Sequence, residues 1–277
     1  MSGVILLDGP VGTELERRGL PLPAPVWSAQ AVIERPDLLT AIHGDYAAAG
    51  AQVHTAATFR TTARALRDTP WAGRWEELAA RAVALCRAAA APGGRVAGSL
   101  APLEDCFSPQ LTPDDAALAR EHAALADALS RAGCDLLLVE TMPTLRELRA
   151  ATRAAAATGL PTWAAVTLGP AGGFFDATEL RAARTAAADE GAQAFLVNCS
   201  RVEDVTEALE GLARSRSPAG LHLGAYANAL FGEGRGGTPE EYALAAERWR
   251  ASGADILGSC CGTGPAHVAA LKARFGG

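Results

Sequence analysis

The sequence predicts an α/β fold, a single-domain (β/α)8 TIM barrel that takes up residues 1–277. Three observations point to this architecture. Short apolar segments alternate with longer segments of helical period, as they do where helices connect parallel strands. Eight such pairs can be counted, and eight parallel strands can close into a barrel without leaving a free edge. The length of 277 residues is that of one such barrel.

The eight expected strands are short runs bounded by turn residues. They are residues 4–7, 52–58, 95–100, 136–140, 162–168, 194–199, 222–228 and 256–261. Each is followed by a segment with Ala, Leu, Arg and Glu at helical spacing. The expected helices are residues 37–49, 75–90, 113–132, 145–157, 177–190, 202–214, 239–251 and 265–274. The unit of strand followed by helix therefore repeats eight times.

A threonine shortly before a proline marks the start of three of these helices, at Thr112-Pro113, Thr238-Pro239 and Thr263-Gly264-Pro265. An open doubly wound sheet is the structural alternative. Its glycine signature is missing, because the stretch "GEGRGG" at residues 232–237 has the wrong spacing and does not open a helix directly. We interpret that stretch as a flexible loop.

The composition excludes several classes of function. The formal charge is -6 and the charged residues are interspersed, which argues against nucleic acid and anionic membrane surfaces as partners. No apolar run has the roughly 20 residues of a bilayer span, and the N-terminus lacks a signal peptide, so we expect a cytoplasmic protein. Lys272 is the only lysine and lies near the C-terminus, which excludes chemistry that needs a buried lysine amine.

Side chains at the carboxyl ends of the strands would converge on one mouth of the barrel. They are Asp8, Thr58, Glu140, Cys199, Asn228, Cys260 and Cys261. Because the sixth and eighth strands flank the seventh, three of the six cysteines can meet there. Three thiolates with one open position form a catalytic zinc arrangement, in which the open position accepts a substrate atom.

Other interpretations of the cysteines remain open on spacing alone. Cys260 and Cys261 could serve in packing or form a redox-active vicinal disulfide. We interpret Cys86 and Cys134, in helical segments, as buried packing residues. Cys106 lies in a loop after the third strand, and we leave it outside the ligand set.

Five motifs resemble, in the same order, those of the homocysteine S-methyltransferase family. They are "LLDGPVGTEL" (6–15), "TAATFRTT" (55–62), "LLLVETMPTLRE" (136–147), "LVNCS" (196–200) and "GSCCGTGPAHVAAL" (258–271). The family includes S-methylmethionine-dependent and betaine-dependent enzymes and the homocysteine module of cobalamin-dependent methionine synthase. The resemblance covers essentially the whole chain. It implies a Zn2+ ion held by Cys199, Cys260 and Cys261.

The resemblance also implies contacts with substrate. Asp8, Glu140 and the backbone around Thr13 would help to hold the amino-acid end of homocysteine. Arg60 stands where some members of the family have tyrosine or glutamine, so we expect the donor pocket of this chain to differ from theirs. After the seventh strand, Ala227-Asn228 replaces a Pro-Asn pair. The candidate substrate-binding residues also include Thr58, Arg60 and Asn228.

The implied reaction is transfer of a methyl group from a small onium donor to the thiolate of L-homocysteine, which gives methionine. S-methylmethionine and S-adenosylmethionine are the favoured donors, because the barrel leaves no segment for a cobalamin or folate module. The onium leaves as a neutral group and needs no general acid, in keeping with the absence of histidine from the expected strand ends. Small molecules are therefore the expected partners.

Two alternatives stay open at the level of sequence. One is methyl transfer to or from another thiol or a selenol, and the other is a non-catalytic zinc-binding or redox-sensing protein. Trp27, Trp71 and Trp75 could face an onium group, but we expect them to serve in core or surface packing.

Overall fold

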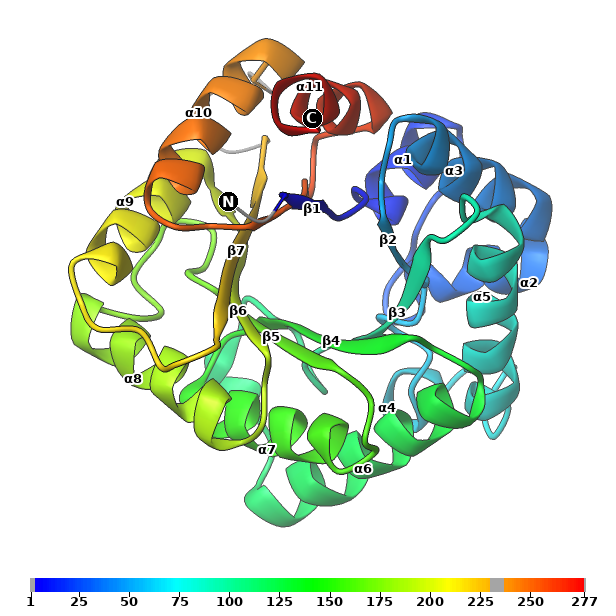
Figure 1. The fold of residues 1–277 in the computed structure, drawn as a ribbon. Coiled ribbons are helices and arrows are strands. Elements are labelled where there is room, and N and C mark those ends of the chain that lie inside the picture. Colours follow the sequence, from blue (N-terminus) through cyan, green and yellow to red (C-terminus); the bar gives the residue numbers. More distant parts are fainter. Residues whose placement is uncertain (1–2, 230–236, 277) are drawn as a thin grey trace.

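A computed structural model describes residues 3–229 and 237–276 of the chain. Its eight strands are parallel and form one sheet in the order β1-β8-β7-β6-β5-β4-β3-β2. A bridge between Leu7 and Val53 joins the two ends of this order, so the sheet closes on itself. Figure 1 looks along the barrel and shows the helices as an outer ring. The predicted (β/α)8 architecture is confirmed. Residues 232–236, expected to form a flexible loop, lie outside the described residues.

The described strands are β1 (Ile5–Leu6), β2 (Val53–Thr55), β3 (Arg95–Leu100), β4 (Leu136–Met142), β5 (Thr162–Thr167), β6 (Ala194–Arg201), β7 (His222–Asn228) and β8 (Ile256–Leu257). The predictions for residues 52–58 and 256–261 were too long. Residues 56–58 and 258–259 stay buried beyond the strand ends, and a buried apolar run resembles a strand in sequence. At Gly258 a Cβ atom would lie 2.7 Å from that of Leu7, so the chain passes close to β1 as it leaves β8.

The eight predicted helices are present within two residues of their expected bounds. They are α3 (Pro36–Ala48), α5 (Trp75–Ala89), α6 (Asp115–Arg131), α7 (Leu145–Ala156), α8 (Ala177–Asp189), α9 (Val202–Ala213), α10 (Pro239–Ala251) and α11 (Pro265–Phe275). Cys134 lies just beyond α6 and not within a helix, although it is buried as expected. Among the described residues, no helix combines the length and the apolar character that crossing a membrane would require.

The predicted helix starts at Pro239 and Pro265 are confirmed, but α6 begins two residues after Pro113, and only one of the three threonines caps its helix. Thr238 caps α10 by accepting a hydrogen bond from the backbone N–H of Glu241. The cap of α6 is Asp114 and not Thr112, because a carboxylate two residues later is better placed to accept from Ala117. Before α11 the hydroxyl of Thr263 donates to the carbonyl oxygen of Cys260 instead of capping the helix.

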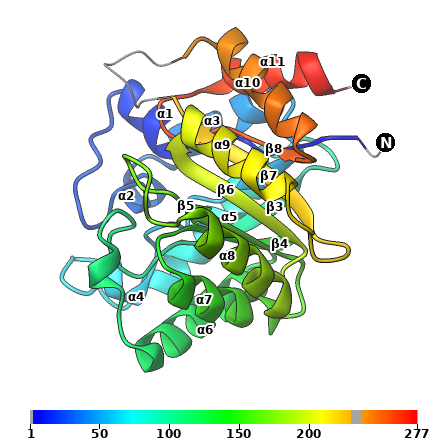
Figure 2. The same ribbon diagram turned by 90° about the vertical axis from the view of Figure 1, so that its left-hand side faces the viewer.

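Short helices in the loops that follow β1, β2 and β3 were not predicted. They are α1 (Val11–Arg17), α2 (Ala29–Glu34), α4 (Ala63–Leu66) and the 3-10 helix η1 (Pro109–Leu111). Each has seven residues or fewer, which is too short for a helical period to stand out in the sequence. Figure 2 shows α2 and α4 on the side of the barrel away from both labelled termini. These segments therefore build up one mouth of the barrel.

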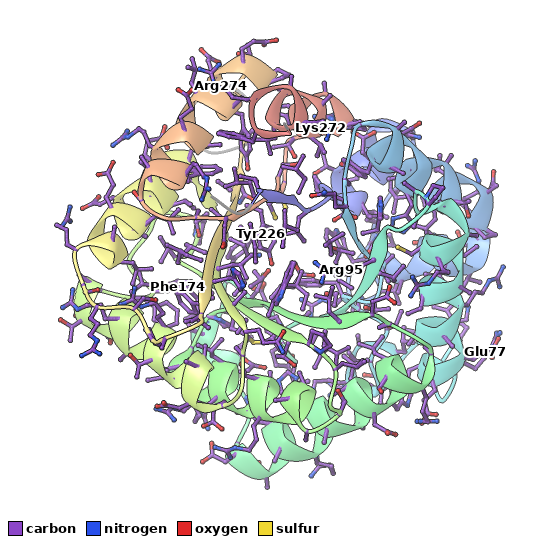
Figure 3. The ribbon with its side chains drawn as sticks, viewed as in Figure 1. Glu77, Arg95, Phe174, Tyr226, Lys272 and Arg274 are labelled. Carbon is purple, nitrogen blue, oxygen red and sulfur yellow. The ribbon has the colours of Figure 1, made fainter. Side chains whose placement is uncertain are left out.

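The core has two layers. One fills the space between the sheet and the helices, and the other fills the barrel itself with residues such as Leu138, Trp163 and Leu196. Tyr226, on β7, lies within the ring of strands in Figure 3 and closes this inner layer on the side of the mouth. The barrel is thus a packed support, and a cavity opens at its mouth.

Candidate active site and metal centre

Three cysteine thiols meet at the carboxyl ends of β6 and β8. The Sγ atoms of Cys199, Cys260 and Cys261 all lie within 4.8 Å of one another, and those of Cys199 and Cys261 are 4.0 Å apart. Tetrahedral zinc with bonds of about 2.3 Å to sulfur holds its sulfur ligands about 3.8 Å apart. All three cysteines are free thiols. The donor set and its spacing therefore fit a zinc ion with a fourth position for a substrate atom.

The two adjacent cysteines can converge because the chain has left strand geometry before it reaches them. The N–H of Cys260 donates to the carbonyl of Ala227 at 2.9 Å, and the N–H of Ala229 donates to the carbonyl of Cys261 at 2.9 Å. The next residue, Gly262, has φ +82°, a conformation that glycine adopts without steric cost. Neighbouring side chains are therefore not forced to opposite faces, as they would be in a regular strand.

Cys199 and Glu140 occupy matching irregularities in two strands. The pairing of β6 with β7 shifts between Asn198 and Arg201, and that of β4 with β5 shifts between Val139 and Met142. Such bulges re-aim the side chains that they contain. Cys199 itself has φ +47°. Sequence reasoning missed these irregularities, since strand patterns give no sign of a bulge.

The side chain of Asn198 links the two irregularities. Its Oδ1 accepts from the N–H of Thr141 at 3.1 Å, and its Nδ2 donates to the hydroxyl of Thr141 at 2.8 Å. Thr141 follows Glu140 directly and has φ +61°. Through these bonds Asn198 holds the backbone beside Glu140, a role that the sequence analysis did not predict. The available signal was its position directly before Cys199 in "LVNCS".

Two buried carboxyl groups lie beside the sulfurs. Asp8 accepts hydrogen bonds from the N–H and the hydroxyl of Thr55, at 2.8 and 2.9 Å. Glu140 accepts from the hydroxyls of Ser99 and Tyr226. No arginine or lysine in the described parts of the chain forms an ion pair with either carboxyl group. The three hydrogen-bonding partners were not predicted, because their roles depend on which residues face one another across the strands.

Burial dominates the electrostatics of these two acids. It raises the pKa of Asp8 to about 8, against the opposing effect of the hydrogen bonds from Thr55. It likewise raises the pKa of Glu140 to about 7, although the hydrogen bonds from Ser99 and Tyr226 favour the anion. A cationic ligand would stabilise both carboxylates, since neither has a cation of its own.

The thiols influence one another strongly. Hydrogen bonds from Cys199 and Cys260 hold the pKa of the Cys261 thiol well below its usual range. Hydrogen bonding to Cys260 and Cys261 raises the pKa of Cys199. Burial raises the pKa of Cys106 to about 12, and its thiol lies outside the group of three converging cysteines although it lines the same cavity.

A cavity of about 640 Å³ opens above these groups. Of the candidate residues, Asp8, Arg60, Glu140 and the three cysteines line it. The other candidate residues do not line the cavity; they are Thr13, Thr58 and Asn228. The hydroxyl of Thr13 accepts from the N–H of Gly262 at 3.1 Å, and that of Thr58 bonds to the backbone of Ser99. Asn228 donates to Cys199 Sγ at 3.7 Å.

Of the three loop tryptophans, only Trp27 lines the cavity, where its ring meets the ring of Phe59 edge-on at 5.5 Å between centroids. Trp71 and Trp75 pack against an apolar cluster that includes Leu66 and Leu78, as expected for packing residues. None of the histidines in the described residues lines the cavity.

Comparisons with known proteins agree with this geometry. The model of a family described as Homocysteine S-methyltransferase matches residues 5–275. The chain is 33% identical to a homocysteine S-methyltransferase of Escherichia coli, over 98% of this chain and 95% of that protein. It is 30% identical to a methionine synthase of Mycobacterium tuberculosis, over 98% of this chain but 24% of that longer protein. The structure of the homocysteine methyltransferase MmuM from E. coli in its metallated form superimposes with a TM-score of 0.83, at 31% identity, covering 99% of this chain and 96% of that one.

Proposed function

The chain belongs to the homocysteine S-methyltransferase family, and from this premise we propose a specific reaction and metal. The protein transfers a methyl group from a small onium donor, S-methylmethionine or S-adenosylmethionine, to the sulfur of L-homocysteine, and methionine is the product. Cys199, Cys260 and Cys261 hold the Zn2+ ion that the reaction uses.

One observation carries the proposal. Three converging thiols and two buried carboxyl groups without a cation line the floor of the same cavity. Homocysteine has the two groups that this floor lacks, a thiol to complete the metal site and an ammonium group to face Asp8 and Glu140. A redox sensor or a structural metal site would have no use for the two carboxylates. The enzyme is therefore favoured over a non-catalytic protein.

The chemistry requires little acid-base assistance from the chain. A bound zinc ion would deprotonate and orient the homocysteine thiol, whose unperturbed pKa is about 8.5. A bond forms between the homocysteine sulfur and the methyl carbon while the bond from that carbon to the donor's onium atom breaks. The electron pair of the broken bond stays with the donor, which leaves as a neutral molecule. No protonation of the leaving group is needed, which suits a cavity lined by no described histidine.

The cavity walls suit an onium donor. Trp27, Phe59 and Phe107 line the cavity, and aromatic faces attract organic cations. The volume of about 640 Å³ falls within the usual range for small-molecule sites, about 300 to 1,000 Å³. These features support a soluble cationic donor together with the amino-acid acceptor.

The test is an assay of protein purified under reducing conditions, with L-homocysteine and a panel of donors that includes S-methylmethionine, S-adenosylmethionine and betaine. We expect methionine from a sulfonium donor and about one zinc per chain. Cys199→Ala should lose both the zinc and the activity. Cys134→Ala, which removes another buried thiol outside the cavity, should keep both. No methionine from any donor, or full activity in zinc-free protein, would contradict the proposal.

A further inference from the structure

Three arginines line the cavity, and only one of them lacks an acidic partner among the described residues. Arg64 pairs with Glu104 and Glu121, each at 2.7 Å. Arg67 pairs with Asp68 at 3.1 Å. Arg60 forms no ion pair in the part of the chain that the structure describes, although acidic residues line the same cavity. A cation left unpaired in a ligand cavity points to an anionic group on the ligand.

The contacts of Arg60 fix the direction of its side chain. Its Nη1 donates to the carbonyl oxygens of Pro102 and Glu104, at 3.4 and 3.1 Å, and its Cζ lies 5.2 Å from the centre of the Phe59 ring. The Nε and Nη2 atoms have no acceptor among the described residues. These two nitrogens form one edge of the planar guanidinium, and that edge matches the two oxygens of a carboxylate.

The position of Arg60 separates it from the acceptor's binding groups. Asp8, Glu140 and the three cysteines lie at or just after strand ends, whereas Arg60 bonds to the loop that follows β3. An acceptor whose sulfur and ammonium occupy the floor leaves Arg60 to the second substrate. That substrate brings a positive charge, which an unpaired guanidinium would repel unless the same molecule also carries an anion.

We propose that Arg60 forms a carboxylate subsite for the methyl donor, through a side-on pair from Nε and Nη2. The donor is accordingly an onium compound that also bears a carboxylate, such as a sulfonium amino acid. This inference rests on the proposed function and deepens it, because it assigns a residue to the carboxylate that both proposed donors carry. It makes Arg60 a specificity-determining residue.

The experiment compares two donors that share one sulfonium group, S-methylmethionine and its carboxamide, in steady-state assays with L-homocysteine. Wild type should have the lower KM for the acid. Arg60→Gln should raise that KM roughly 10- to 100-fold, the range expected for a lost charged pair. The KM for the carboxamide and for homocysteine should change by less than about twofold. Arg60→Lys should recover part of the loss, because it restores the charge without the fork.

Arg67→Gln is the matched control, since Arg67 lines the same cavity but already has an acidic partner. It should leave all KM values unchanged. The inference fails if wild type uses both donors equally, if Arg60→Gln raises both donor KM values alike, or if it raises the KM for homocysteine instead. Those results require an active wild type, so they differ from the absence of methionine from every donor, which would overturn the proposed function and this inference together.

Discussion

The backbone of Cys199 has φ +47°, a conformation that residues other than glycine rarely adopt. A residue held in this left-handed region costs roughly 1 to 3 kcal/mol, which the surroundings must offset. The hydroxyl of Thr167 donates to the Cys199 carbonyl at 3.1 Å, and Asn198 is bonded to Thr141. These bonds hold the strained backbone at Cys199, whose side chain must turn toward Cys260 and Cys261.

Asp8 gives a prediction at the scale of the residue. Asp8→Asn keeps the size of the side chain but removes the buried carboxyl group that a cationic ligand would stabilise as the anion. We expect the KM for homocysteine to rise roughly 10- to 100-fold, because the substrate ammonium loses a charged partner. Steady-state assays with varied homocysteine measure this. Asp68→Asn is the control, since Asp68 lines the same cavity near its exposed rim. An unchanged KM in Asp8→Asn would place the ammonium elsewhere.

At the scale of the element, α1 braces the turn that carries the adjacent cysteines. Arg17 donates from Nη1 to the carbonyl of Thr263 and from Nη2 to that of Gly262, both at 2.9 Å. Its Nη1 also contacts Glu14, which is buried, at 2.7 Å. The hydroxyl of Thr13 meets the N–H of Gly262 from the same helix. A seven-residue helix therefore fixes a turn that lies about 250 positions away in the chain.

This brace predicts that Arg17→Ala weakens zinc binding by about tenfold, because groups that orient metal ligands usually contribute 10- to 100-fold to affinity. Competition with a zinc-chelating dye measures the Kd without any assay of turnover. Arg18→Ala is the matched control, because Arg18 bonds to Glu14 and Asp45 but not to the cysteine turn. Equal zinc affinity in both variants would show that α1 does not position the ligands.

At the scale of the whole molecule, the barrel was predictable because alternation of strand and helix repeats along the chain and is independent of detail. Strand order indicated that Cys199 and the adjacent pair Cys260 and Cys261 could meet, and the family resemblance implied that they do. The bulges at Glu140 and Cys199 could not be foreseen, because they arise from register between strands distant in sequence. The roles of Ser99, Tyr226 and Thr55 depend on the same register. Short helices such as α1 escaped prediction because their apolar contacts come from other parts of the chain.

The global stability should depend on pH through two histidines buried between α3 and β2. The ring of His43 has no hydrogen-bond partner among the described residues. Burial lowers the pKa of His43 to about 3 and that of His54 below its usual range. Both rings therefore take up protons at lower pH in the folded protein than in the unfolded chain, where histidine is protonated below about pH 6.5. The contribution to stability is therefore present above pH 6.5 and is lost as the pH falls toward 3.

His43 should lower the free energy of unfolding by about 1.4 kcal/mol per pH unit below its unfolded pKa, because its folded pKa of about 3 lies well below that range. Urea unfolding of reduced, zinc-free protein at pH 6.5 and 5.0 measures the loss. His43→Leu should make the loss smaller by one proton's contribution, because the titrating ring is gone. Equal losses in wild type and His43→Leu would mean that the ring is charged in the folded state.

The Asn198 bridge has a thermodynamic consequence. Because one amide side chain ties the bulge of Cys199 to the bulge of Glu140, a ligand that orders one bulge also orders the other. Thermodynamic linkage makes such an effect reciprocal. A ligand at the three cysteines would strengthen binding at Glu140 by the same factor as a ligand at Glu140 strengthens binding at the cysteines. We therefore expect the two halves of the cavity floor to be coupled through Asn198, a residue that does not line the cavity.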